Sequence, residues 1–218
     1  MDIKVDKNTV IVFDLDDTLY NEIDYLKSAY IAISKELEPK KWKQLFTQLF
    51  ALYRNKNDVF EYICNTYAIE KDDLIQRYRN HVPHIKPFLG VVNTLKEIKN
   101  KNGKLAIITD GRTVTQKNKL KSLGLVQYLD YIVISEEIGT EKPNELNYRA
   151  IENHFQLNSY YYFADNFKKD FITPKKLGWR TVALIDNGLN IHSNAHLNTN
   201  DEYLPDSYLS SFSKLKIT

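Results

Sequence analysis

The stretch VIVFDLDDTLY, from Val10 to Tyr20, carries the strongest structural signal in this 218-residue chain. Its first four residues are apolar and mostly β-branched, which is typical of a buried β-strand. Three aspartates, Asp14, Asp16 and Asp17, follow directly where that strand would end. Like charges repel, and a buried carboxylate is costly without a partner. The stretch therefore predicts a positively charged group close to these side chains.

The composition is that of a globular protein, with 43% hydrophobic and 27% charged residues. A net charge of +2 gives no overall electrostatic reason to expect a nucleic acid or membrane partner. Cys64 is the only cysteine, which excludes an intrachain disulfide and a cysteine zinc cluster. The first residues, MDIKVDKNTV, contain no long apolar segment typical of a signal peptide or anchor. We expect a cytoplasmic protein, as a monomer or a homodimer.

Five apolar runs predict strands: TVIVFD, KLAIITD, YIVIS, YYYFAD and RTVALID. Helical patterns separate the last four runs, and this alternation favours an α/β fold with a parallel sheet covered on both faces. The tail after Asp186 is rich in Asn and Ser, and we expect it to be irregular. A short final helix is predicted from about Asp206 to Leu215.

The first two predicted strands are separated by a long helical segment. From Asp24 to about Asn80, aromatic and aliphatic residues recur at helical spacing and no strand pattern interrupts them. The segment ends at HVPHIKPFLG, whose prolines and glycine break helical structure. We therefore predict a helical cap at residues 21–84, inserted into a core formed by residues 1–20 and 85–218.

Polar segments follow four of the strands. The first, second and fourth strands end in DLDDT, TDGRT and ADNFKKD, and the third leads into GTEKPN. In an open parallel sheet, ligands bind beyond the carboxyl ends of the strands, so these segments are expected to meet. Asp14, Asp16 and Asp165 would supply the hard oxygen ligands that Mg²⁺ prefers. Thr109 offers a hydroxyl and Lys142 a positive charge, which are suited to binding a phosphoryl group and stabilising its transfer.

The spacing of the first two aspartates is informative. In extended backbone, residues two apart face the same way, so Asp14 and Asp16 would point to one side. One carboxylate could attack phosphorus while the other transfers a proton. A bound divalent cation would be the positive partner that this aspartate-rich stretch requires.

Four motifs occur in the order typical of a known family. They are FDLDDTL, IITDG with Thr109, EKP with Lys142, and FADNFKKD with Asp165 and Asp170. Over about Val10 to Ile185 the chain resembles the haloacid dehalogenase-like hydrolase superfamily, specifically its phosphatases with a helical cap. The resemblance implies a Rossmann-like core with a five-stranded parallel sheet, and a cap that closes over the substrate.

The resemblance also implies roles for single residues. Asp14 would be the nucleophile and a Mg²⁺ ligand. Asp16 would be the general acid and base, and would bind the metal through its backbone carbonyl. Asp165 would be a further metal ligand, and Asp170 would support the metal site.

The phosphate group would be bound by Thr109, Lys142 and the backbone N–H of Asp110. The Asp110 side chain replaces the asparagine of many relatives, and we expect it to point away from the phosphate. Arg112 and Tyr20 are candidate contacts for the rest of the substrate.

The implied substrate is a small phosphorylated metabolite: a sugar phosphate, a nonulosonate phosphate or a nucleoside monophosphate. The segment TDGRTVTQKNKLKSLGL is similar to that of the sialic acid 9-phosphate phosphatase and pyrimidine nucleotidase branches. Three alternatives remain open on the same fold: a phosphomutase, a 2-haloacid dehalogenase and a catalytically idle binding module. The presence of both Asp16 and Asp165 argues against the dehalogenase.

Overall fold

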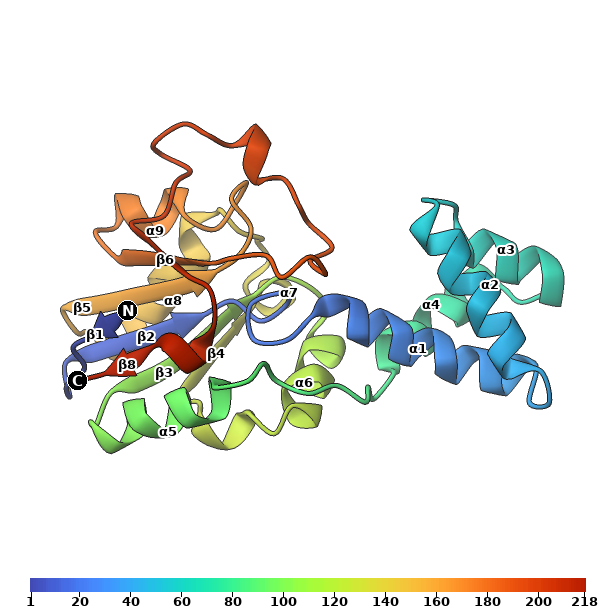
Figure 1. Cartoon of the computed structure of the whole chain (residues 1–218), viewed down its shortest axis with the longest axis horizontal. Helices are drawn as coiled ribbons and strands as arrows, with labels where there is room; N and C mark the ends of the chain where they lie inside the picture. Colours follow the sequence, from blue (N-terminus) through green and yellow to red (C-terminus); the bar gives the residue numbers. More distant parts are fainter.

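A six-stranded parallel sheet forms the centre of the computed structural model, which describes residues 1–218 (Figure 1). Its strands, in spatial order, are β4 (Tyr131–Ile134), β3 (Lys104–Thr109), β2 (Thr9–Phe13), β5 (Ser159–Ala164), β6 (Arg180–Leu184) and β7 (Ser207–Leu209). Two short strands, β1 (Asp2–Ile3) and β8 (Lys216–Ile217), pair in parallel and bring the chain ends together.

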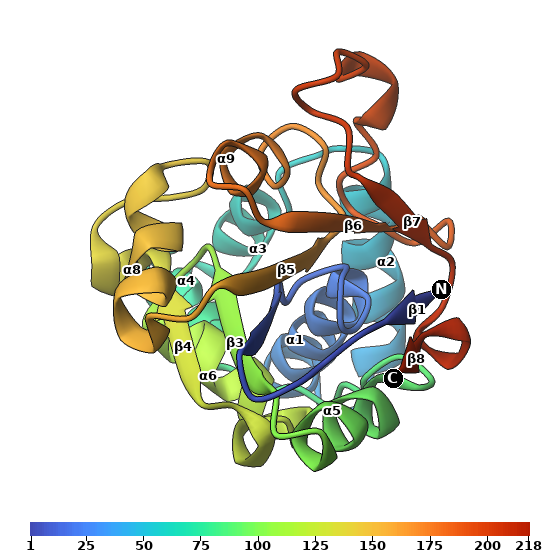
Figure 2. The same ribbon diagram turned by 90° about the vertical axis from the view of Figure 1, so that its left-hand side faces the viewer.

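Helices cover both faces of the sheet, as Figure 2 shows in a view from the side. α5 (Val91–Asn100) and α6 (Thr113–Ser122) pack against one face. α8 (Glu145–Phe155) and α9 (Ile172–Lys176) cover the other, and α7 (Ser135–Ile138) follows β4. The part of the chain around the sheet also contains three 3₁₀ turns: Val126–Tyr128, Ala195–Leu197 and Phe212–Lys214. No helix is long and apolar enough to cross a membrane.

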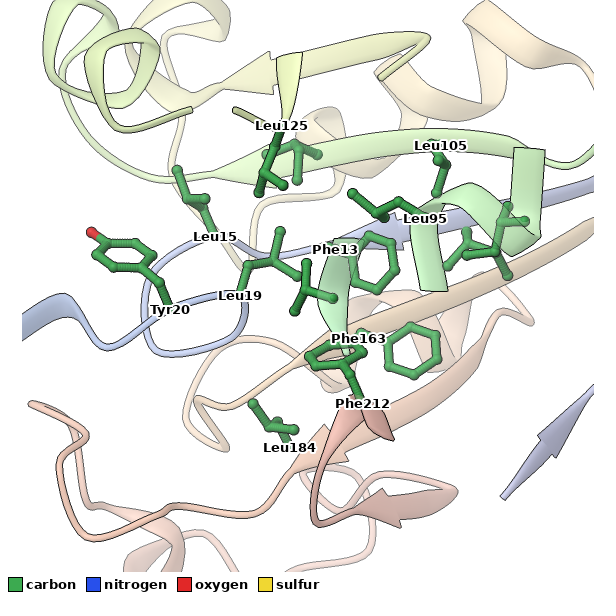
Figure 3. Packing of buried hydrophobic residues seen from close by; sticks show 14 of the residues in the cluster. Phe13, Leu15, Leu19, Tyr20, Leu95, Leu105, Leu125, Phe163, Leu184 and Phe212 are labelled. Carbon is green, nitrogen blue, oxygen red and sulfur yellow. The ribbon is translucent and has the colours of Figure 1, made fainter. Parts of the chain in front are cut away.

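The core follows from strand periodicity. Successive side chains of a strand point to opposite faces of the sheet. Phe13 and Phe163 therefore pack together beneath α5, with ring centroids 5.1 Å apart (Figure 3). Val12 and Tyr162, their neighbours in sequence, lie in the apolar cluster on the opposite face. Because both faces are buried, the strands appear in the sequence as continuous apolar runs.

Residues between β2 and β3 form a unit of four helices, α1 (Glu22–Leu37), α2 (Trp42–Arg54), α3 (Val59–Tyr67) and α4 (Lys71–Asn80). These helices enclose an apolar cluster of their own, which includes Leu45, Leu49 and Ile63. Figure 1 shows this helical unit standing apart from the sheet, on the side where β2 ends. Its role as a cap, with boundaries at residues 21–84, stays a prediction.

The α/β fold with a parallel sheet is confirmed, but the strand number was wrong. The sixth strand, β7, lies within the segment predicted as a final helix, where only the turn Phe212–Lys214 is helical. The Asp206 carboxylate accepts hydrogen bonds from the backbone N–H and the hydroxyl of Thr181, at 2.7 and 2.9 Å. These contacts align β7 beside β6. A three-residue strand depends on such pairing, which sequence periodicity does not show.

The apolar cluster of the helical unit allows a direct test. Leu49 is fully buried there, so Leu49→Ala should lower the free energy of unfolding by about 2–5 kcal/mol. Leu146→Ala, at a position 57% exposed, should change it by less than about 0.5 kcal/mol. Urea unfolding followed by circular dichroism measures both. Equal effects of the two substitutions would contradict the packing described here.

Candidate active site

Sheet topology brings the predicted site residues together. β2 lies between β3 and β5, so Asp14, Thr109 and Asp165 stand side by side at the carboxyl ends of three adjacent strands. A cavity of about 220 Å³ opens at this edge, and no hydrophobic residue lines it. Its lining includes Asp14, Asp16, Thr109, Asp110, Asp165 and Lys169.

Two members of a buried acidic cluster, Asp14 and Asp165, line the cavity. Carboxylate oxygens of Asp14, Asp165 and Asp170 lie within 4.8 Å of one another. The ammonium of Lys142 sits between two of them, 2.6 Å from Asp14 Oδ1 and 2.8 Å from Asp170 Oδ1. The Thr18 hydroxyl lies 3.3 Å from both Asp14 Oδ2 and Asp165 Oδ1. The cluster is therefore stabilised by the Lys142 ammonium and by hydrogen bonds with the Thr18 hydroxyl.

The cluster carries an excess of negative charge. Burial raises the pKa of Asp14 to about 7, although the neighbouring Lys142 acts in the opposite direction. Burial, together with Asp14 and Asp170, raises the pKa of Asp165 well above its ordinary value. Burial lowers the pKa of Lys142, but the two carboxylates beside it outweigh this and raise it well above its ordinary value.

This donor set fits a divalent cation. Three carboxylates face one ammonium, so two negative charges have no partner when all four groups are ionised. Hard oxygen donors of this kind suit Mg²⁺. Asp14 and Asp165 would be its ligands, with Asp170 beside them, and the expected contribution of the Asp16 backbone carbonyl stays a prediction.

The carboxylate of Asp16 lies outside this cluster and is bound by α6. Lys119 Nζ lies 2.7 and 2.8 Å from its two oxygens, Gln116 Nε2 donates at 2.9 Å, and the Tyr20 hydroxyl also donates. Burial would raise the pKa of Asp16, but the Lys119 ammonium and these hydrogen bonds lower it below its ordinary value. Sequence reasoning missed both Gln116 and Lys119, because they occupy an ordinary polar helix pattern.

Asp110 is among the residues that line the cavity, and the expected direction of its side chain, away from the phosphate, stays a prediction. Its Oδ2 lies 2.6 Å from the ammonium of Lys169. Its Oδ1 accepts the backbone N–H of Lys142 at 3.0 Å. Lys169 therefore offsets a carboxylate that would otherwise repel a phosphate. Its position next to Asp170 in FADNFKKD was the only signal for this residue in the sequence.

Two weaker candidates do not line the cavity. Arg112 forms an exposed ion pair with Glu136 at 2.9 Å. Tyr20 is completely buried, and its hydroxyl is used by Asp16. A contact of either residue with substrate stays a prediction.

The Asn-rich segment after β6 supplies contacts that the sequence did not indicate. Asn190 Nδ2 donates to Asp165 Oδ2 at 2.9 Å, and the Ile191 N–H donates to Asp17 Oδ2 at 2.7 Å. Asp17 also accepts the backbone N–H of Glu22 at 2.8 Å. These bonds tie the segment to the loop after β2 and fix one oxygen of Asp165.

The fold and site agree with comparisons to known proteins. A family model described as haloacid dehalogenase-like hydrolase matches residues 11–184. The chain belongs to this family. The resemblance drawn from the four motifs is thereby confirmed, and the protein is a haloacid dehalogenase-like hydrolase.

Relatives of this hydrolase include a glyceraldehyde 3-phosphate phosphatase of Methanocaldococcus jannaschii, 28% identical over 80% of this chain and 84% of that protein. The pyrimidine 5′-nucleotidase YjjG of Escherichia coli is 29% identical over 62% of this chain and 66% of its own length. Among solved structures, the magnesium-bound HAD-hydrolase YfnB of Bacillus subtilis has a TM-score of 0.65 at 19% identity, covering 94% and 96% of the two chains. That likeness supports the fold.

The charge excess of the cluster predicts a pH dependence of stability. The pKa of Asp14 is about 7 when folded, against an ordinary value of 3.8, so the metal-free native state holds a proton that the unfolded state releases. The free energy of unfolding should therefore fall as pH rises from about 5 to about 7.5. Urea unfolding in EDTA measures this slope, which should be shallower for Asp14→Asn. Identical slopes for the wild-type protein and Asp14→Asn would contradict the raised pKa of Asp14 as the cause of the pH dependence.

Proposed function

We propose that this hydrolase is a Mg²⁺-dependent phosphatase of small phosphorylated metabolites that forms an aspartyl-phosphate on Asp14. One observation carries the proposal: a buried carboxylate, held 2.6 Å from a lysine ammonium, faces a wholly polar cavity beside two further aspartates. The cavity of about 220 Å³ has room for a phosphate group. Since one water occupies roughly 30 Å³ in the liquid, some waters would fit beside it.

In the first step, an Asp14 oxygen attacks phosphorus and a new P–O bond forms. The bond from phosphorus to the leaving oxygen breaks, and that oxygen takes a proton from Asp16, which must first be protonated against the Lys119 ammonium that lowers its pKa. The Lys142 ammonium, the Thr109 hydroxyl and the Asp110 N–H would hold the phosphoryl oxygens. Because the Thr109 oxygen accepts the Gln116 N–H at 2.7 Å, its own proton is left to donate to phosphate.

In the second step, Asp16 as a carboxylate takes a proton from water. The resulting hydroxide attacks phosphorus, the acyl-phosphate bond breaks, and inorganic phosphate leaves. Asp14 is regenerated as a carboxylate, and Asp16 holds the proton for the next turnover. The two aspartates thus have separate tasks. Their surroundings also differ, since Asp14 lies in the acidic cluster and Asp16 contacts α6.

Asp14, Asp165 and Asp170 would hold Mg²⁺, together with the Asp16 backbone carbonyl. When bound, the ion would supply positive charge that lets a phosphate dianion approach the carboxylates. The Thr18 and Asn190 side chains keep Asp165 oriented for this task.

The leaving group is the open part of the proposal. Related proteins act on glyceraldehyde 3-phosphate and on pyrimidine nucleotides, so sugar phosphates and nucleoside monophosphates lead the candidates. Nonulosonate phosphates remain in the set because of the TDGRTVTQKNKLKSLGL segment. We propose that the helical unit, residues 21–84, is the cap that excludes bulk water and contacts the leaving group.

The nucleophile is tested by Asp14→Asn, which removes the attacking charge and keeps the size of the side chain. The wild-type protein should release phosphate from at least one member of a panel of phosphorylated metabolites when Mg²⁺ is present. Asp14→Asn should lose at least about 10³-fold in kcat, in line with loss of an essential nucleophile. Retention of near-wild-type turnover would refute the assignment, and isomerised product without free phosphate would indicate a mutase.

Metal binding is tested without reference to activity. Binding to the native state alone raises its stability, by about 2.7 kcal/mol at 100 times the dissociation constant. Millimolar Mg²⁺ should therefore raise the melting temperature of the wild-type protein, and Asp165→Asn should remove most of that shift. Asp73→Asn, at an exposed position of α4, is the control and should keep it. An unchanged shift in Asp165→Asn would exclude this aspartate as a ligand.

A further inference from the structure

Helix α6 directs two buried polar side chains at the cavity. Gln116 is 1% exposed and Lys119 is 4% exposed. They lie three positions apart and therefore on the same face of the helix. Neither residue lines the cavity, so both act behind the groups that do. Both lie in the segment TDGRTVTQKNKLKSLGL, but the resemblance drawn from that segment gave neither residue a role.

Lys119 and Gln116 hold the Asp16 carboxylate at both oxygens. The Lys119 ammonium contacts Oδ1 and Oδ2 at 2.7 and 2.8 Å, and Gln116 Nε2 contacts Oδ2 at 2.9 Å. The Tyr20 hydroxyl completes the set at Oδ1. A carboxylate bound at both oxygens by three side chains has little freedom to rotate. Its direction is therefore set by α6 and by Tyr20.

Gln116 also connects Asp16 to the phosphate-binding loop. The same Nε2 atom lies 2.7 Å from Thr109 Oγ1 and 2.6 Å from the Asp110 carbonyl oxygen. One amide thus sets the distance between the proton-transfer group and the hydroxyl that would hold the phosphate. Its other atom, Oε1, is buried without a hydrogen-bond partner. The Gln116 side chain therefore makes its hydrogen bonds to the site through Nε2, while its Oε1 makes none.

The contacts of the buried lysine indicate its role, because a buried charge is costly unless it is paired. Besides Asp16, the Lys119 ammonium lies 4.7 Å from the centre of the Tyr25 ring and 3.9 Å from Glu22 Oε1. These are weaker contacts than those to Asp16. The strongest interaction of this buried lysine is with the carboxylate assigned to proton transfer.

An adjacent face of α6 is bonded to the helical unit. The Thr115 hydroxyl donates to the Arg79 carbonyl at 2.9 Å, and Asn118 Nδ2 donates to the Asn80 carbonyl at 3.1 Å. These acceptors are at the end of α4, where helix carbonyls lack partners within the helix. α6 is thus joined both to the helical unit and to Asp16.

We propose that Lys119 and Gln116 are positioning residues that orient Asp16 for proton transfer to the leaving oxygen. This inference rests on the proposed function, because it presumes that Asp16 is the general acid. It predicts that substitution of either residue slows the hydrolysis of some phosphate esters more than that of others. An alkyl phosphate needs its leaving oxygen protonated, whereas 4-nitrophenolate is stable enough to leave without a proton. Loss of orientation at Asp16 should therefore affect the alkyl ester far more.

The test compares kcat/KM for an alkyl phosphate from the active panel and for 4-nitrophenyl phosphate. Lys119→Met should lower the alkyl value by about 10²-fold, the lower end of what general acid–base catalysis contributes. The 4-nitrophenyl value should fall by less than about 5-fold, since its cleavage makes little use of the acid. Gln116→Met should show the same selectivity, and Lys119→Arg should recover part of the alkyl activity.

Lys117→Met is the matched control. Lys117 lies two positions before Lys119 on the same helix, is exposed, and pairs with Glu137 at 2.7 Å. This variant should leave both kcat/KM values unchanged. Melting temperatures of all variants report on folding. If Lys119→Met does not fold, Gln116→Met provides the same comparison without leaving Asp16 lacking its cation.

Three results would overturn the proposal: equal losses for both esters, no loss for either, or a gain for the alkyl ester. The last would mean that α6 restrains Asp16. Failure of the proposed function has a different signature, because the wild-type protein would then hydrolyse neither ester. Asp16→Asn tests separately whether Asp16 is the general acid. If that variant lacks the leaving-group selectivity, Asp16 is not the acid, whatever Lys119 does.

Discussion

The buried contact of Lys142 with Asp14 and Asp170 is the interaction around which this site is organised. A parallel sheet collects the carboxyl ends of its strands at one edge, and here those ends carry several aspartates. Their mutual repulsion and burial would oppose folding without compensation. The Lys142 ammonium, within 2.8 Å of both carboxylates, offsets part of this charge. The uncompensated remainder is the physical reason for expecting a divalent cation.

Three lysines from different segments of the chain each pair with a different carboxylate at the site. Lys142, in the loop before α8, neutralises the cluster that contains Asp14. Lys169, after β5, pairs with Asp110, and Lys119 of α6 pairs with Asp16. Under the proposed function, this division would separate the tasks of Asp14 and Asp16 within one small cavity. The carboxylate assigned to nucleophilic attack and the one assigned to proton transfer lie two residues apart, yet each has its own lysine.

The resulting arrangement connects distant parts of the chain. α6 contacts both Asp16 and the end of α4. The Asn-rich segment after β6 reaches both Asp165 and the loop after β2. The helical unit, the sheet and the C-terminal segment therefore all determine how the site carboxylates are oriented. This provides a structural role for the polar segment after Asp186, which has little regular structure of its own.

Local sequence patterns were sufficient for the parallel α/β sheet and for the aspartates at the ends of β2 and β5, because strand periodicity and the residues that follow a strand are local properties. They were insufficient for β7, which exists through its pairing with β6. Lys119 lies 103 positions from Asp16, in a helix with no distinct apolar face, and its partner depends on how α6 packs. The sequence alone thus determined which chemical groups stand at the sheet edge. Only the tertiary structure decided which cation meets which carboxylate, since side-chain direction follows from packing between elements far apart in the chain.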